Sequence, residues 1–123
     1  MSQDWQGDVE EFHKEVIGDN FAPYPHLEWN KRELRISLMR EELQELETAL
    51  HKGDLPGIAD GAADLIVVTL GTMVTYGIDL RPIWDEVHRT NMLKKDGPIR
   101  ADGKKLKPPD WKGPEIARLL EEQ

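Results

Sequence analysis

Four carboxylates occupy positions at which a helix of a water-soluble protein normally carries apolar side chains. Glu42 and Glu45 are three residues apart, and Asp60 and Asp64 are four apart within an otherwise uncharged apolar run. Spacings of three and four place side chains on one face of a helix. Two such helices facing each other would bring four acids together. Buried acids without partners are costly, so we expect a cation between the two helices.

Helical geometry supports an inward orientation for these acids. At about 100° of rotation per residue, the two glutamates fall between the apolar side chains of the helix that contains Leu34. The two aspartates lie in the segment from Leu55 to Ile78, which contains no Lys, Arg or His and is apolar on every side. Small residues flank them there, which predicts a close approach of the two helices.

The chemistry of these side chains favours a hard metal ion. Four like charges in a poorly solvated space repel one another, so the acids are either protonated or neutralised by a cation. Oxygen ligands, in a chain without cysteine or a plausible histidine cluster, favour Mg²⁺ or Mn²⁺ over zinc. The alternative is a solvated acidic face, which is the commoner state of glutamates on helices. Aspartates inside an apolar helix weigh against that alternative.

Periodicity and capping residues predict an all-α fold, a bundle of four to five helices in a single domain of residues 1–123. Asn30 with Glu33 resembles a capping box, and Asp54 and Asp79 are expected caps of the next two helices. Residues 96–111 are rich in Gly, Pro and Lys, and residues 101–104 predict a turn in a basic loop or short hairpin. The expected helices cover residues 3–17, 31–51, 55–76, 80–93 and 114–122.

Whole-chain properties limit the partners. The apolar surface around residues 55–78 predicts that a second copy completes the bundle, as a homodimer or homotetramer. The uninterrupted apolar stretch there, about 14 residues, is shorter than a bilayer requires, so we expect a core helix and no membrane. The net charge of −8 argues against nucleic-acid binding. The N-terminus lacks the pattern of a secretory signal, and we expect a cytoplasmic protein, or one of the host cytoplasm if phage-encoded.

A family resemblance emerges from the acids and their surroundings together. Glu41-Glu42-x-x-Glu45, followed on the next helix by Ala63-Asp64-Leu65, resembles the MazG-like all-α nucleoside triphosphate pyrophosphatases. This superfamily includes phosphoribosyl-ATP pyrophosphohydrolase and dimeric dUTPases. The likeness extends over roughly residues 8–120 and is similar to the phosphoribosyl-ATP pyrophosphohydrolase-like subgroup of bacteria and phages. The segments that carry it are residues 58–65, 76–80, 86–92 and 105–109.

The resemblance implies an enzyme that cleaves nucleoside triphosphates between the α- and β-phosphates, releasing a monophosphate and pyrophosphate. It implies a role in control of nucleotide pools, with dGTP or GTP and dUTP as leading substrate candidates. Glu42, Glu45 and Asp64 would ligate Mg²⁺, for which Mn²⁺ could substitute. Glu41 would be a further ligand or the base that orients the attacking water.

Residues at the end of the fourth expected helix would bind the phosphates. Asn91 and Lys94 match positions that touch phosphates in the superfamily, and Arg89 and Lys95 are neighbouring cations. Phosphoryl transfer is favoured by cations on both flanks of the transferred group. A solvated basic tail is the alternative. The nucleotide base could be recognised by a polar side chain that hydrogen-bonds to its edge, such as that of His13, Asn20 or Asn30.

One departure from the superfamily pattern concerns its second motif, Glu-x-x-Asp. The matching tetrad here is Gly61-Ala62-Ala63-Asp64, so the glutamate is missing. Asp60 is the natural substitute, although its side chain starts about 100° away around the helix, and it would contact the metal directly or through water. Two other functions stay open: a non-catalytic helical oligomer stabilised by metal, and an acidic adaptor that engages a basic partner.

Overall fold

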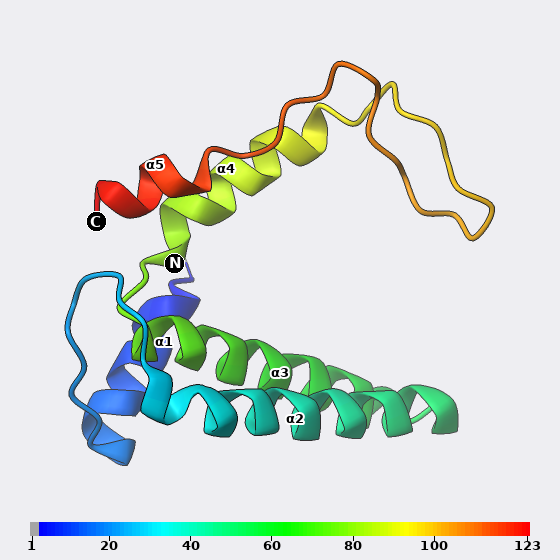
Figure 1. Cartoon of the computed structure of the whole chain (residues 1–123). Coiled ribbons are helices and arrows are strands. Elements are labelled where there is room, and N and C mark those ends of the chain that lie inside the picture. The colour runs from blue at the N-terminus through cyan, green and yellow to red at the C-terminus, as the bar shows by residue number, and fades with distance from the viewer. Residues whose placement is uncertain (1–2) are drawn as a thin grey trace. The chain divides into compact units, whose positions relative to one another are not determined.

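The computed structural model describes residues 3–123 and is all-helical, as predicted (Figure 1). Within these residues there is no strand, only an isolated antiparallel bridge between Ile99 and Lys105. Packing groups the chain into two compact units, one up to Asp79 and one from Leu80 to Gln123. The single-domain assignment stays a prediction. The helices are α1 (Trp5–Phe12), continued by a π-helical turn (His13–Ile17), then a 3-10 turn (Trp29–Lys31), α2 (Arg32–Lys52), α3 (Leu55–Thr75), α4 (Leu80–Met92) and α5 (Ile116–Glu121).

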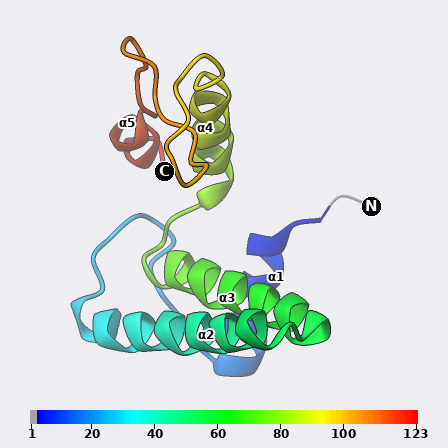
Figure 2. The ribbon, with the colours of Figure 1, turned by 90° about the vertical axis from the view of Figure 1, so that its right-hand side faces the viewer.

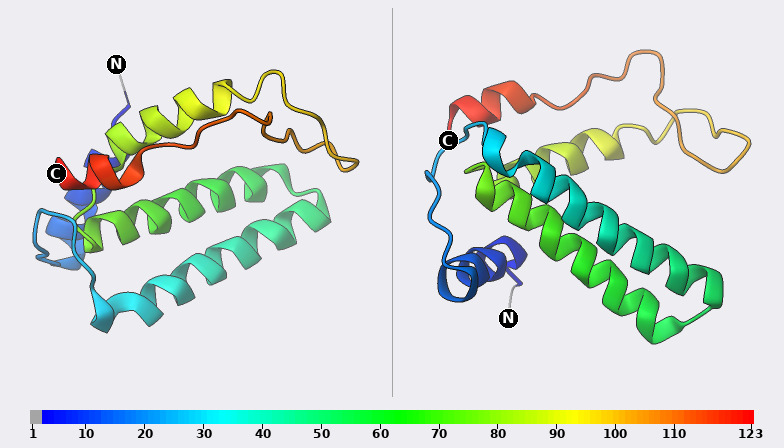
Figure 3. Two further views of the ribbon diagram at one scale, coloured as in Figure 1. Left: turned by 45° about the horizontal axis from the view of Figure 1, so that its top comes forward. Right: turned by 60° about the horizontal axis from the view of Figure 1, so that its bottom comes forward.

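Helices α2 and α3 form an antiparallel hairpin that dominates the first unit (Figure 3). Gly53 ends α2 in the left-handed conformation, with φ of 66°. Asp54 then caps α3, because its carboxylate accepts a hydrogen bond of 3.2 Å from the backbone N–H of Gly57. The two-residue connection therefore reverses the chain as the sequence predicted.

The two helices approach closely where glycines lie in their interface. A Cβ atom added to Gly61 would lie 3.1 Å from the Cα atom of Leu46, and one added to Gly57 would lie 3.2 Å from the Cβ atom of Ala49. Even an alanine at Gly61 would press on the backbone of α2. This confirms the expected close approach of the two helices.

Toward the other end of the hairpin, the interface contains a buried arginine. Arg35 on α2 is 6% exposed, and its guanidinium donates two hydrogen bonds to α3. Nε donates to the hydroxyl of Thr72 at 3.2 Å, and Nη2 donates to the carbonyl of Val68 at 2.7 Å. Burial lowers the pKa of Arg35, and the negative charge of Asp19 acts in the opposite direction.

His13 lies beside this arginine and belongs to the π-helical turn after α1. Its side chain is buried, and its Nδ1 is 3.3 Å from the carboxylate of Asp19. Burial lowers the pKa of His13, the charge of Arg35 lowers it further, and Asp19 partly offsets both. A Cβ atom on Gly71 of α3 would collide with both His13 and Arg35. His13, which the sequence offered as a residue to bind the nucleotide base, is therefore packed inside the first unit.

The segment from Gly18 to Glu28 links α1 to α2 and is fastened to the end of α3 (Figure 2). The backbone N–H of His26 donates to the carbonyl of Tyr76 at 3.0 Å, and the Tyr76 hydroxyl donates to the carbonyl of Glu28 at 3.4 Å. Gly77 has φ of 66° and lies directly against the carbonyls of Ala22 and Tyr24. The turn after α3 is thus built around a residue without a side chain.

The predicted capping box at Asn30 is wrong. Asn30 lies inside the 3-10 turn, and neither this turn nor α2 has a side-chain cap. The N–H of Lys31 donates to the carbonyl of Glu28 at 3.1 Å, while the carboxylate of Glu33 accepts from Nε of Arg32 at 3.2 Å. The tighter turn supplies backbone hydrogen bonds at the helix start, which removes the need for a capping side chain.

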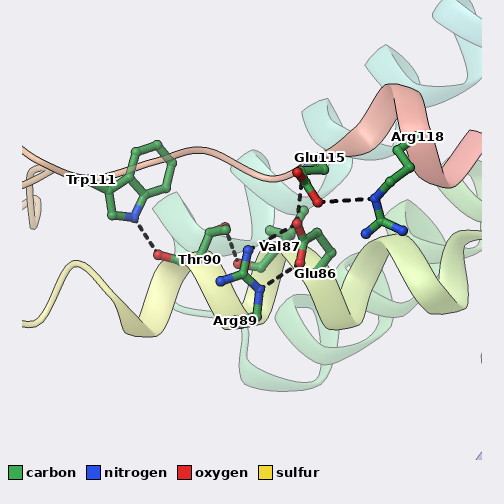
Figure 4. Close-up of polar contacts among 7 residues, drawn as sticks. All are labelled: Glu86, Val87, Arg89, Thr90, Trp111, Glu115 and Arg118. Carbon is green, nitrogen blue, oxygen red and sulfur yellow. Dashed lines mark hydrogen bonds and ion pairs between the residues drawn. The ribbon is translucent and has the colours of Figure 1, made fainter.

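In the second unit, α5 packs beside α4 through a network centred on Glu86 (Figure 4). Its carboxylate accepts hydrogen bonds from Nε of Arg89 at 2.7 Å and from the backbone N–H of Glu115 at 2.9 Å. These bonds lower the pKa of Glu86 to about 2. The indole N–H of Trp111 donates to the carbonyl of Thr90 at 2.6 Å, so the returning chain is attached to α4 at two places.

The predicted turn at residues 101–104 is confirmed. Arg100 donates its N–H to the carbonyl of Lys104 at 2.7 Å, and Leu106 donates to that of Pro98 at 2.7 Å. Gly103, with φ of 96°, occupies the position of the turn that requires a left-handed residue.

Helix α3 has the length and composition of a membrane-spanning helix. It is 21 residues long, and 17% of its most apolar 18-residue window is buried. The helix is therefore longer than the uninterrupted apolar stretch of about 14 residues that the sequence shows. Since the core helix of a soluble protein has the same properties, the assignment of α3 to a core stays a prediction.

Substitution of Gly77 should be strongly destabilising. In Gly77→Ala, the new methyl would collide with two backbone carbonyls and force alanine into a left-handed conformation, so we expect a loss of about 2 kcal/mol or more in the free energy of unfolding. Urea denaturation measures this. Gly18→Ala is the matched control, because Gly18 has φ of 80° and no neighbour within 4 Å of a new Cβ atom. Equal losses in the two variants would contradict the role of the carbonyl contacts.

His13 should make the stability of the protein dependent on pH. Because its pKa is lowered in the folded state, the unfolded chain takes up a proton more readily, and stability present above the ordinary pKa of 6.5 is lost as the pH falls below it. Between pH 7.5 and 5.5, the Tm of the wild type should fall by a few degrees more than that of His13→Gln. His51→Gln, at an exposed position at the end of α2, is the control. Parallel Tm curves for wild type and His13→Gln would refute this assignment.

Candidate metal centre

Three of the predicted acids meet between α2 and α3. One carboxylate oxygen from each of Glu42, Glu45 and Asp64 lies within 4.8 Å of the others. Glu42 and Asp64 are half-buried, and Glu45 is exposed. Among residues 3–123, this is the one group of three or more acidic or histidine side chains arranged closely enough to hold a metal ion.

The packing of the helix hairpin explains why these acids meet. Glu42 lies one turn before Leu46 on α2, and Asp64 lies one turn after Gly61 on α3. Because the helices are antiparallel, the contact between Leu46 and Gly61 brings the next turn of each helix together as well. Glu45 joins them because a spacing of three residues keeps it on the same side of α2 as Glu42.

The electrostatics of the cluster are unfavourable without a cation. Burial raises the pKa of Glu42, and the negative charges of Glu45 and Asp64 raise it further. The Oε2 atom of Glu42 is buried and has no hydrogen-bond partner. A buried carboxylate oxygen without a donor is a costly arrangement, and a metal ion would satisfy it.

The donor set fits a hard divalent cation. All three donors are carboxylate oxygens, which Mg²⁺ and Mn²⁺ prefer. Two oxygens on one Mg²⁺ are at most about 4.2 Å apart, so the observed limit of 4.8 Å requires only small side-chain adjustments. Three protein ligands would leave several positions of an octahedral ion for water and substrate oxygens.

Two further predicted ligands lie outside the cluster. Glu41 and Asp60 are both exposed and do not belong to the group of three, whereas the sequence suggested four clustered acids. Asp60 precedes Gly61, and its side chain therefore starts about 100° away from the glycine that contacts α2. Glu41 still acts on the site, because its charge contributes to the raised pKa of Glu42. A role for either residue in metal binding stays a prediction.

The predicted phosphate-binding residues all belong to the second unit. Nζ of Lys94 donates to the Asn91 side chain at 2.9 Å and lies 5.1 Å from the ring centroid of Trp111. Nζ of Lys107 lies 4.7 Å from the same ring. Arg89 is exposed but is paired with Glu86. Lys95 is exposed. Trp111 was not among the predicted site residues, and its position among lysines was the only signal for these contacts.

The helical fold and the carboxylate cluster in a helix hairpin define a class, the MazG-like all-α pyrophosphohydrolases. Residues 9–91 match the family described as phosphoribosyl-ATP pyrophosphohydrolase, and this chain belongs to that family. The matched region is well over half of the chain and contains all three clustered acids. Among curated proteins, none matches the sequence. Family membership makes the protein a pyrophosphohydrolase that acts on a nucleotide phosphoanhydride.

Removal of one clustered acid should stabilise the metal-free protein. In the presence of a chelator at pH 7.5, Glu42→Gln should raise Tm by a few degrees, because it removes a half-buried charge from between two other carboxylates. Calorimetry or circular dichroism measures this. Glu47→Gln, on an exposed position of α2, should leave Tm nearly unchanged. A lower Tm for Glu42→Gln than for Glu47→Gln would show that repulsion does not dominate at the cluster.

Proposed function

We propose that this protein is a metal-dependent (deoxy)nucleoside triphosphate pyrophosphohydrolase that releases a nucleoside monophosphate and pyrophosphate. The observation that carries the proposal is the cluster of Glu42, Glu45 and Asp64, with one buried carboxylate oxygen that lacks a partner. Its role would be control of the cytoplasmic nucleotide pool, with dGTP or GTP and dUTP as the leading substrates.

The three clustered acids would hold Mg²⁺, or Mn²⁺ in its place. Such an ion, when bound, lowers the pKa of water and offsets charge on phosphoryl oxygens. Hydrolysis then needs no protein nucleophile: the oxygen of water forms a bond to the α-phosphorus, and the bond to the bridging oxygen of pyrophosphate breaks. Glu41, exposed one residue before Glu42, would orient the water and accept its proton.

Charge distribution supports an anionic substrate. The unit from Leu80 to Gln123 contains 10 of the 16 Lys and Arg residues but only 8 of the 24 Asp and Glu residues. Asn91, Lys94, Arg89 and Lys95 are our candidates for contact with the phosphates. The acidic first unit would bind an anionic substrate only through metal ions.

We also propose that the active form is a homo-oligomer, a dimer or tetramer. Large apolar side chains are exposed on several helices of the single chain, including Leu55 at 75%, Leu50 at 56% and Trp84 at 66%. Contacts between identical copies are the commonest way in which soluble proteins cover such surfaces.

A substrate panel tests the proposed activity. We expect the protein with Mg²⁺ to release a monophosphate and pyrophosphate from at least one canonical (d)NTP, and we include phosphoribosyl-ATP because the family bears its name. Asp64→Asn should reduce kcat/KM by about 100-fold or more, since it removes a charged metal ligand. Chromatographic separation of the products identifies the bond that is cleaved.

The control is Asp54→Asn, which keeps a capping side chain at the start of α3 and lies outside the cluster. Its turnover should match that of the wild type. If Mg²⁺ raised Tm but no substrate released pyrophosphate, the cluster would be a structural metal site and the proposed catalytic function would be rejected.

A further inference from the structure

The hydrogen bonds of Arg35 join the two helices that carry the metal ligands. The guanidinium is on α2, seven residues before Glu42, and both of its acceptors are on α3, at Val68 and Thr72. The Thr72 hydroxyl in turn donates to the carbonyl of Val68 at 2.9 Å. Arginine, hydroxyl and carbonyl therefore form a closed polar group in the interface between α2 and α3.

This polar group and the glycine contacts bracket the carboxylates. On one side, Gly61 touches Leu46, three residues before Asp64 on α3. On the other side, Val68 accepts from Arg35, four residues after Asp64. At 1.5 Å of rise per residue, each contact is about one helical turn from the aspartate.

The two contacts differ in what they constrain. Glycine against a helix backbone sets how closely the helices approach, but smooth surfaces permit small axial shifts and rotations. A planar guanidinium with two acceptors on successive turns fixes axial position and rotation together, because hydrogen bonds weaken steeply with misalignment. An axial shift of only one residue, about 1.5 Å, would move a carboxylate out of bonding distance of a Mg²⁺ ion, whose bonds to oxygen are about 2.1 Å long.

We propose that Arg35, through Thr72 and Val68, is a positioning residue that sets the register of α2 against α3 at the carboxylate cluster, and thereby its affinity for metal. The inference rests on the proposed function, because it assumes that Glu42, Glu45 and Asp64 bind a metal ion. Arg35 itself touches neither metal nor substrate. Its buried position and its neighbours explain why an arginine lies on the inner face of an acidic helix.

Thr72→Val tests the proposal with the smallest change in shape. The substitution keeps the volume, removes the acceptor of Arg35 Nε, and should weaken binding of Mn²⁺ about tenfold, as loss of a group that orients metal ligands does. Mn²⁺ binding is measured by electron paramagnetic resonance and titration calorimetry, well below the Tm of each variant. Thr72→Ser restores the hydroxyl and should recover affinity to within about twofold of the wild type.

Two controls separate positioning from a general loss of stability. Thr69→Val changes the same residue type on the same helix, where the hydroxyl is exposed and bonds only to the carbonyl of Leu65. Gly77→Ala lowers stability without altering Arg35 or either of its acceptors. Both should bind Mn²⁺ like the wild type. Wild-type affinity in Thr72→Val, or an equal loss in Thr72→Ser and Thr72→Val, would overturn the proposal.

A variant that does not fold is replaced by a second one. If Thr72→Val is unfolded, Arg35→Lys, which keeps the charge but not the two-pronged geometry, must show the same weakening, and wild-type affinity in it would overturn the inference. Failure of the wild type itself to bind Mn²⁺ would reject the proposed metal centre, and with it this inference. That result is distinct from equal binding by wild type and variants, which rejects only the role of Arg35.

Discussion

The register of α2 against α3 is the constraint on which the candidate site depends. The clustered acids come from two helices, so their distances are set by how those helices are aligned and not by either helix alone. Gly61 against Leu46 determines the separation of the helices, and Arg35 with its two acceptors determines their alignment. A short connection at Gly53 and Asp54 limits the alternatives further, because it leaves little slack between the helix ends.

The interior of the first unit combines two costly features. Arg35 and His13 are buried in one region, and Glu42 is held between two other acids in the next turns of the same hairpin. Each cluster disfavours folding when considered alone, since buried charge requires compensation. Arg35 is compensated within the chain by hydrogen bonds and by the charge of Asp19. The acids lack such compensation, and this contrast between neighbouring polar groups is what identifies them as a binding site.

Sequence patterns predicted the parts of this structure that depend on local chemistry. The helices around Gly53 and Asp54 follow from a left-handed glycine and a capping carboxylate, and the meeting of Glu42, Glu45 and Asp64 follows from spacing and small residues. The patterns did not predict those features that are determined by contacts between segments distant in the sequence. Asn30 lies in a turn held by backbone bonds, and the hydrogen-bond acceptors of the buried Arg35 lie on another helix, at Val68 and Thr72.

The single chain leaves both the charge of the clustered acids and much apolar surface uncompensated. Among the described residues, only Val9, Ala49, Leu70 and Ile83 are buried hydrophobic side chains, which is a small core for 123 residues. Helices packed through glycine and alanine bury little area per residue, because small side chains give close approach but little apolar surface. The close approach that brings the acids within reach of one ion therefore has a stability cost. A bound cation and a second copy of the chain would each offset part of this cost, so metal binding and association should stabilise the same folded state.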